Sequence, residues 1–96
     1  MNYVGQSVKA NYIKGFESIG GNLHFYDDGF EFKPHALNIQ KHNPFIYYND
    51  ISSVSKRNTL GLVPNGILVS TKDGTEHKLV VFNRQHIMRF LDEVRS

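Results

Sequence analysis

The segment Asn22–Lys33, NLHFYDDGFEFK, is the part of the sequence that most clearly specifies a fold. Hydrophobic and polar side chains alternate on both sides of Asp28-Gly29, a dipeptide that favours a tight reversal of the chain. The segment therefore predicts a β-hairpin with one buried face. The residues expected on the buried face are Leu23, Phe25, Phe30 and Phe32. Those expected on the outer face are His24, Tyr26, Glu31 and Lys33.

Similar short segments extend in both directions from this hairpin, and turn-forming residues separate them. Before it, residues 8–19 predict one long, bent strand that ends in a turn at Gly20-Gly21-Asn22. After it, residues 45–48 and 51–56 predict two strands with a bend at Asn49-Asp50. Pro64-Asn65-Gly66 then predicts another turn, and residues 66–72 and 76–82 predict a second hairpin around Asp73-Gly74.

The last part of the chain changes from strand to helix periodicity. Hydrophobic residues recur at a spacing of three and four, which places them on one face of a helix of about three turns. These residues are Ile87, Phe90, Leu91 and Val94. Asn83 precedes them and is a favourable N-cap residue. We therefore predict a mainly β fold of the pleckstrin-homology (PH) type: a bent antiparallel β-sandwich or barrel of about seven strands, capped by one C-terminal α-helix.

Two long segments resemble GRAM domains, a branch of the PH-like superfold. Residues 10–39 contain a Gly-Gly-x-Leu strand, a short turn and a Phe-x-Phe strand with Pro-His. Residues 45–91 add an aromatic strand, the Asp50-Ile51 step, NTLGLVPNGI at 58–67 and a Phe-Asn-Arg junction before the helix. The resemblance covers about residues 10–94 and implies a single domain over residues 1–96. It also implies a non-catalytic module that binds lipids, phosphoinositides or proteins in membrane-associated processes.

Composition excludes several other classes of protein. The 96 residues contain no Cys, which rules out disulfides and thiolate chemistry, and 12% are aromatic, enough to fill a core without a cofactor. The net charge of +2 is too small to indicate nucleic acid as the partner. The first ten residues lack a signal-peptide pattern, and no apolar run could span a bilayer. We therefore expect a cytoplasmic protein whose contact with a membrane is peripheral.

Catalytic and metal-binding patterns are also missing from the sequence. None of the five His residues forms an HxH or HxxxH pair, and no acidic residue is spaced to complete a metal site with them. There is no nucleophile-elbow motif and no glycine-rich phosphate-binding loop. We expect no enzymatic activity, no metal and no cofactor.

Two groups of residues are candidates for binding. The first is the set of basic residues around the connection that follows the Asn22–Lys33 hairpin: Lys33, His35, Lys41 and His42. The second joins a basic pair to aliphatic residues of the next loop: Lys56, Arg57, Leu60 and Leu62. The aliphatic residues of the second group could form a lid over the open end of a barrel, a membrane-dipping tip or a pocket for a partner.

These groups leave two functions open. An adaptor at a membrane surface, or in a membrane-associated complex, would use the basic residues to bind an anionic lipid head group. A protein-binding or oligomerising scaffold without lipid contact would use an exposed strand edge or the groove beside the terminal helix. The scaffold would bind a protein partner or a second copy of the chain.

Overall fold

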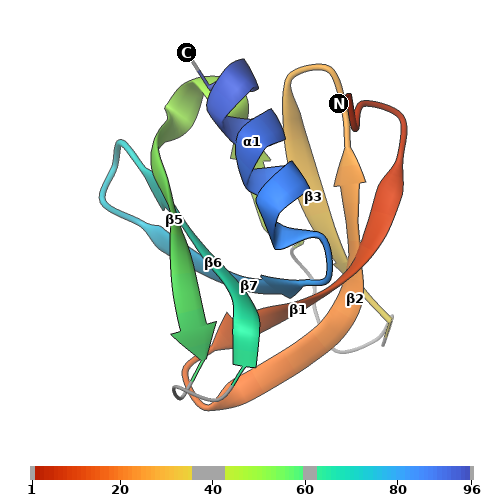
Figure 1. Ribbon diagram of the computed structural model, residues 1–96, viewed down its shortest axis with the longest axis vertical. Helices are drawn as coiled ribbons and strands as arrows, with labels where there is room; N and C mark the ends of the chain where they lie inside the picture. Colours follow the sequence, from red (N-terminus) through yellow and green to blue (C-terminus); the bar gives the residue numbers. More distant parts are fainter. Residues whose placement is uncertain (1, 36–42, 60–62, 96) are drawn as a thin grey trace.

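The computed structural model describes residues 2–35, 43–59 and 63–95 (Figure 1). These residues form seven strands, one short 3-10 helix (η1) and one α-helix. In chain order the elements are β1 (Ser7–Lys14), β2 (Glu17–Phe25), β3 (Gly29–Pro34), β4 (Phe45–Tyr47), η1 (Tyr48–Asp50), β5 (Ile51–Thr59), β6 (Val63–Thr71), β7 (Glu76–Val81) and α1 (Arg84–Val94).

All seven strands belong to one antiparallel sheet with the order β4-β3-β2-β1-β7-β6-β5. The sheet curls into a half-barrel, and α1 lies across its concave side (Figure 1). This arrangement confirms the prediction of a bent antiparallel sheet closed by a C-terminal helix. Because the sheet does not close on itself, β4 and β5 are its two edge strands.

The prediction of one long strand over residues 8–19 is wrong. The chain reverses at Gly15, which has a φ of 61°, a left-handed conformation that favours glycine. Lys14 and Glu17 pair on the two sides of this turn. The absence of a consistent hydrophobic face over residues 8–19 is explained by the presence of two strands.

The turns predicted at Gly20-Gly21-Asn22 and at Pro64-Asn65-Gly66 are also wrong, because both segments lie inside strands. At Gly21 the reason for glycine is proximity to β3. A Cβ atom there would lie 2.3 Å from the carbonyl oxygen of Lys33 and 2.8 Å from the Cα of Pro34. Gly21 therefore allows β2 and β3 to approach each other closely.

Other local predictions are confirmed. The Asn22–Lys33 hairpin forms with its four expected apolar side chains buried. The second hairpin turns at Gly74, which has a φ of 90°. The bend at Asn49-Asp50 is η1, although β4 is shorter and β5 longer than predicted.

The core is an aromatic and aliphatic cluster between the sheet and α1. Phe25 lies at its centre, with ring centroids 5.4 Å from Tyr3, 5.6 Å from Phe30 and 5.6 Å from Phe90. The Phe90 ring, which belongs to α1, also meets Tyr48 edge-on at 5.8 Å. Edge-to-face and tilted contacts of this kind add to the hydrophobic stabilisation of a core. Phe90 thus joins the helix to β2 and η1.

The predicted helix face is correct, but the predicted cap is only half right. Ile87, Phe90 and Leu91 are buried against the sheet. Asn83 occupies the N-cap position, yet its side chain makes no capping hydrogen bond. The first turn of α1 also contains no acidic residue. Its free N–H groups therefore keep their partial positive charge.

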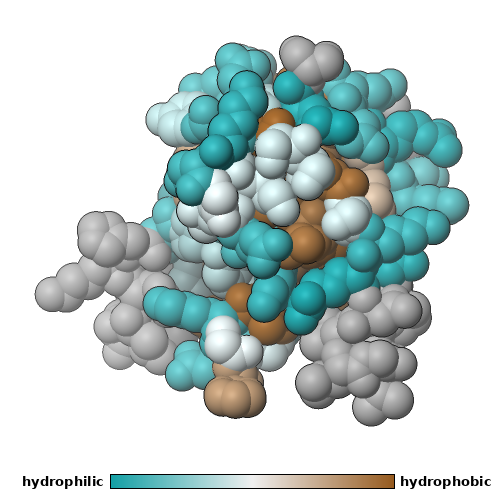
Figure 2. Space-filling view, turned by 90° about the vertical axis from the view of Figure 1, so that its left-hand side faces the viewer, coloured by the Kyte–Doolittle hydropathy of each residue, from teal (hydrophilic) through white to brown (hydrophobic). Residues whose placement is uncertain are grey.

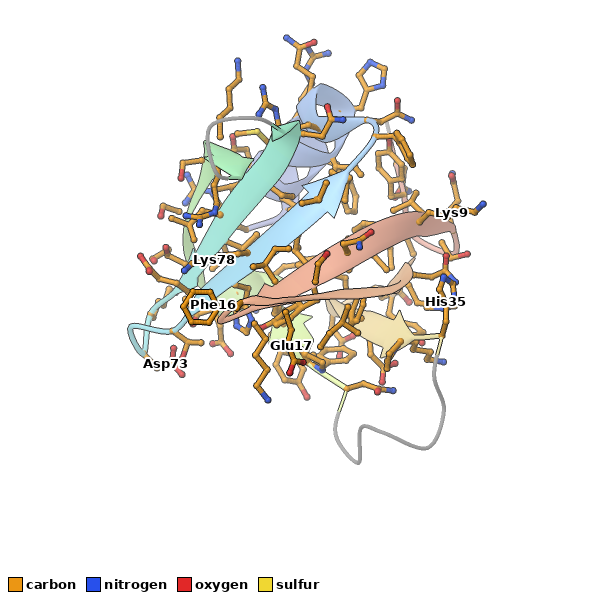
Figure 3. All side chains as sticks on the ribbon, turned by 90° about the horizontal axis from the view of Figure 1, so that it is seen from below. Lys9, Phe16, Glu17, His35, Asp73 and Lys78 are labelled. Carbon is orange, nitrogen blue, oxygen red and sulfur yellow. The ribbon has the colours of Figure 1, made fainter. Side chains whose placement is uncertain are left out.

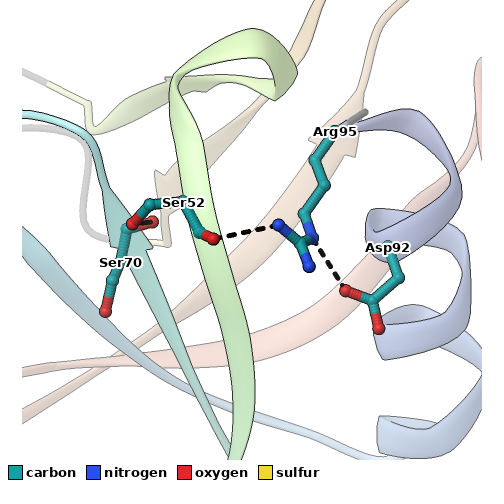
Figure 4. A network of polar contacts seen from close by, with 4 residues as sticks. All are labelled: Ser52, Ser70, Asp92 and Arg95. Carbon is teal, nitrogen blue, oxygen red and sulfur yellow. Dashed lines mark hydrogen bonds and ion pairs between the residues drawn. The ribbon is translucent and has the colours of Figure 1, made fainter.

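Arg95 attaches the C-terminal end of α1 to the edge strand β5 (Figure 4). Its Nε donates to the carboxylate of Asp92 at 2.9 Å, and its Nη1 donates to the carbonyl oxygen of Ser52 at 2.9 Å. The Ser52 hydroxyl in turn donates to the carbonyl oxygen of Ser70 at 3.0 Å. Ser52 lies at a register shift in the β5–β6 pairing, so the clamp occupies an irregular part of the edge.

Few large hydrophobic side chains are exposed in the part of the chain that the structure describes. On the side of β5, β6 and the β6–β7 turn, hydrophobic residues appear only as a narrow, interrupted band framed by hydrophilic ones (Figure 2). Among the described residues, the large exposed hydrophobic side chains are Phe16, Tyr26, Phe45, Tyr47 and Phe82. Three of these five lie on or beside β4, which makes that edge unusual for a surface.

Candidate functional site: a basic surface around Phe82

Two neighbouring cavities lie on the outside of the sheet and share two lining residues, Asn65 and Phe82. The smaller has a volume of about 170 Å³ and lies over β1, β2 and β7. The larger has a volume of about 400 Å³ and lies at the beginning of α1. The ring of Phe82, at the junction of the two, is 79% exposed. We call this combined region the basic surface.

Basic side chains surround Phe82 on both sides. They are Lys9, His35, Lys56, Arg84 and His86. The described residues that line the two cavities include no Asp and no Glu. In a protein with 11 Lys and Arg against 9 Asp and Glu, this separation of charge creates a local positive field.

The smaller cavity depends on backbone pairing and on a missing side chain. The His35 N–H donates to the carbonyl oxygen of Gly20 at 3.0 Å, which holds His35 beside β2. Gly20 lines the cavity and has no side chain that would fill it. Lys9 comes from the neighbouring strand β1, and Lys9 and His35 lie at the same end of the molecule (Figure 3). Phe16 and Lys78 lie on the other side in that view.

The larger cavity depends on how α1 begins. Arg84 is half-buried, and its Nη1 donates to the carbonyl oxygens of Gly66 at 3.3 Å and Arg57 at 3.5 Å. These bonds fix the first turn of the helix against β5 and β6. Lys56 and His86 are exposed on the rim. The N-terminal partial charge of α1 has the same sign as the side chains, so the whole cavity favours an anion.

The structure brings together some of the residues predicted from the sequence. His35 and Lys56 both belong to the basic surface. Arg57 is next to Lys56 on a strand and so points to the opposite face; it contributes its carbonyl oxygen to Arg84. Its Nε is buried without a hydrogen-bond partner among the described residues. Lys33 lies 3.9 Å from Glu31, which compensates its charge. The remaining predicted residues, Lys41, His42, Leu60 and Leu62, lie outside the described part of the chain.

Sequence reasoning missed Lys9, Phe82, Arg84 and His86 as parts of this site. Arg84 precedes the hydrophobic face of the helix, where a charged side chain is usually solvated. The only local signal that Phe82, Arg84 and His86 carry is their position at the junction between a strand and a helix. Their meeting with Lys9 and His35 depends on the strand order.

A second polar contact joins β1 and β7, apart from the basic surface. The Tyr12 hydroxyl is 2.7 Å from Nδ1 of His77, and both side chains are half-buried. Burial lowers the pKa of His77, an effect that the carboxylate of Asp73 partly opposes. Burial likewise raises the pKa of Tyr12. The neutral forms of both groups are therefore favoured in the folded protein.

This contact predicts that the protein becomes less stable in mild acid. His77 has a lower pKa in the folded state than its ordinary value of 6.5, so the unfolded chain takes up the proton first as the pH falls. At pH values well above 6.5, His77 is neutral in both states and does not affect the free energy of unfolding. As the pH falls below 6.5, the free energy of unfolding decreases. Between about pH 7.5 and about pH 5.5, the melting temperature of His77→Gln should fall less than that of the wild type. Equal losses in the two proteins would contradict the assignment.

Among the described residues, no group of three or more His, Asp or Glu side chains is arranged to hold a metal ion. The same part of the chain contains no helix that is long and apolar enough to cross a bilayer.

Comparisons with known proteins identify the fold. The chain matches no protein-family model and no curated protein sequence. The C-terminal domain of an unknown protein from Leishmania infantum superposes with a TM-score of 0.75 at 17% identity, over 97% of this chain and 84% of that one. The DH/PH domains of p115-RhoGEF superpose with a TM-score of 0.65 at 11% identity, over 96% of this chain and 30% of that one.

The chain has a PH-like fold. This confirms the predicted fold class, since the match to the DH/PH structure covers nearly all of the present chain. At these identities the likeness concerns the fold alone, and one fold of this kind supports many functions. The narrower resemblance to GRAM domains stays a prediction.

Proposed function

We propose that this PH-like domain is a non-catalytic binding module that docks on anionic membrane surfaces through its basic surface. The observation that supports this proposal is the pair of adjoining cavities lined by Lys9, His35, Lys56, Arg84 and His86 around the exposed ring of Phe82. The resemblance to GRAM domains points to the same role, as an adaptor at a membrane or in a membrane-associated complex.

The composition of this surface suits a lipid interface. Lysine and arginine near an anionic leaflet each contribute about 1 kcal/mol of attraction, so several together give measurable binding without any single strong contact. An exposed aromatic ring among cations can enter the interfacial layer while the cations remain at the head groups. Asn65 adds a polar side chain that can hydrogen-bond a phosphate oxygen.

Co-sedimentation with lipid vesicles tests the proposal. We expect the protein to bind phosphatidylcholine vesicles containing about 20% phosphatidylserine and to bind pure phosphatidylcholine vesicles much less. Raising the salt concentration from about 50 mM to about 300 mM should release most of the bound protein, because it screens exposed charges. The double variant Lys9→Glu/Lys56→Glu should bind at least about tenfold more weakly.

Lys78→Glu is the matched control for this experiment. Lys78 lies away from Lys9 and His35 (Figure 3), and its neighbours across the strands are the uncharged residues Ile13 and Leu68. It carries the same change of charge and should keep most of the vesicle binding. The proposal fails if anionic vesicles capture no protein at low salt, or if the control loses as much binding per substituted lysine as the double variant.

A further inference from the structure

The edge strand β4 lies next to a cavity that no element of the described chain fills. This cavity has a volume of about 390 Å³ and separates β4 from the β6–β7 turn. All three residues of β4 line it. The other residues that line it are Asp50, Thr71, Lys72, Asp73 and His77.

The backbone of β4 has hydrogen-bonding groups that no other described strand uses. The Phe32 N–H donates to the carbonyl oxygen of Pro44, and the Tyr48 N–H donates to that of Asp28. In an antiparallel pair, residues alternate between facing the partner strand and facing away from it. Phe45 and Tyr47 therefore direct their N–H and C=O groups away from β3, and no other described strand pairs with them. An added strand could bond to both residues.

Three aromatic rings border this edge on the outer face. The Phe45 and Tyr47 rings have centroids 4.8 Å apart, and Tyr26 stacks on Phe45 at 5.9 Å with an interplanar angle of 17°. Tyr47 is 51% exposed. The faces of such rings carry partial negative charge and attract cations.

Acidic side chains surround the edge as well. Glu31 pairs with Phe45 across β3 and β4, and Asp50 and Asp73 line the cavity. The hydroxyl of Thr71 and the N–H of Thr75 donate to the carboxylate of Asp73 and lower its pKa, which keeps it ionised. The acidic residues in this region are Asp27, Asp28, Glu31, Asp50 and Asp73.

The effect of this charge is visible at Tyr48. Burial, and to a lesser degree the carboxylates of Asp28 and Asp27, raise the pKa of its hydroxyl to about 12. The basic side chains among the described residues of this region are Lys33, which pairs with Glu31, Lys72 and His77, whose pKa is lowered by burial. The region around β4 is thus acidic in a protein whose net charge is positive.

We propose that β4 binds an extended peptide segment of a partner protein that carries arginine or lysine at alternate positions. The segment adds to the sheet as an eighth strand through the backbone groups of Phe45 and Tyr47. Its cationic side chains lie over the rings of Phe45 and Tyr47 and near the carboxylates, and the side chains between them point into the cavity. Charge selects the segment, and backbone pairing fixes its direction and register.

The other edge of the sheet is less suited to such an addition. The β5–β6 pairing has register shifts near both ends of β5, and irregular edges discourage further pairing. Arg95 already occupies the carbonyl oxygen of Ser52.

Fluorescence anisotropy with a labelled hexapeptide of alternating Arg and Val tests the proposal. We expect saturable binding that weakens with salt, and no binding of the peptide in which Glu replaces Arg. The Arg-Val peptide with N-methyl groups on alternate backbone amides, made in both registers, should bind at least about tenfold more weakly in one register. Loss in one register only is the signature of strand addition.

Variants of the protein locate the binding. Tyr47→Ala should weaken binding of the Arg-Val peptide about fivefold through loss of the cation–π contact, and Asp50→Asn should weaken it by a similar factor. Both side chains are exposed, so thermal unfolding should be nearly unchanged. Phe16→Ala removes another exposed aromatic ring, on the β1–β2 turn, and should bind as the wild type does.

Three outcomes would overturn this proposal. The first is equal binding of the Arg and Glu peptides, and the second is insensitivity to N-methylation in both registers. The third is a Tyr47-dependent increase in mass with protein concentration without peptide binding, which would assign the edge to a second copy of the chain. Vesicle binding by Tyr47→Ala separates the two sites, since it should persist whether or not peptide binding is lost.

Discussion

Replacing Gly21 with alanine is expected to lower the free energy of unfolding by about 3 kcal/mol, or about 10 to 20 °C in melting temperature. The added Cβ would lie 2.3 Å from the carbonyl oxygen of Lys33, 2.7 Å from the Phe32 ring and 2.8 Å from the Cα of Pro34. Two of these atoms belong to the backbone of β3 and cannot rotate away. Relief therefore requires the separation of β2 from β3, in the middle of the sheet.

Gly20→Ala is the matched control for this prediction. The two glycines are neighbours in β2, but a Cβ at Gly20 would meet only the Cδ2 of His35, at 3.5 Å, which is an ordinary contact. Alanine also restricts the unfolded chain more than glycine does, so Gly20→Ala should unfold within about 1 kcal/mol of the wild type. Urea unfolding of the two variants measures the difference. Equal stabilities would show that close approach to β3 is not the reason for glycine at position 21.

Phe90→Ala is expected to cost about 3 to 5 kcal/mol, the usual range for removal of a buried phenylalanine. Phe90 is 3% exposed, and its ring contacts Tyr3, Phe25 and Tyr48. These three belong to the N-terminal segment, β2 and η1, so one substitution removes contacts from α1 to several parts of the fold. A domain of this size has a total stability of about 5 to 15 kcal/mol, so the variant should be partly unfolded near 37 °C.

The measurement for Phe90→Ala is urea unfolding followed by circular dichroism. Phe16→Ala removes the same atoms from a fully exposed position, on the β1–β2 turn, and should change the free energy of unfolding by less than about 0.5 kcal/mol. A loss below about 1 kcal/mol at Phe90 would mean that α1 contributes little to the fold.

The elements that the sequence predicted correctly are those whose periodicity is complete within one segment. The alternation over Asn22–Lys33 predicts both a hairpin and its buried face, because side chains of a strand point to opposite faces in turn. The spacing of Ile87, Phe90 and Leu91 does the same for α1. In both segments local pattern and tertiary burial agree, which is why the fold class could be predicted.

The wrong predictions concern glycine and proline, because the structural role of these residues depends on the tertiary contacts around them. Gly15 permits a left-handed turn, whereas Gly21 permits close approach of two strands, and the sequence does not distinguish these two uses. The chain was therefore divided at the wrong glycine. Pro64 was likewise interpreted as a turn, although it lies in β6.

The functional surfaces could be predicted only in part. His35 and Lys56 were identified as cations near loops, but Lys9 and Arg84 join them because β1, β7 and β6 are neighbours in the sheet. No local signal carries that order. The alternation of Phe45 and Tyr47 with Ile46 indicates two faces of β4, yet only the structure shows that the two aromatic residues lie on the exposed one.

The clamp between Arg95 and Ser52 has a consequence for the size of the assemblies that this chain can form. A sheet with two accessible edges can join copies on both sides, and such growth continues into a fibre. Here the register shifts and the guanidinium of Arg95 obstruct β5, whereas β4 remains accessible. Each molecule can then bind one added strand at β4 and none at β5. The proposed binding at β4 would therefore end at a one-to-one complex, because β5 offers no second regular edge.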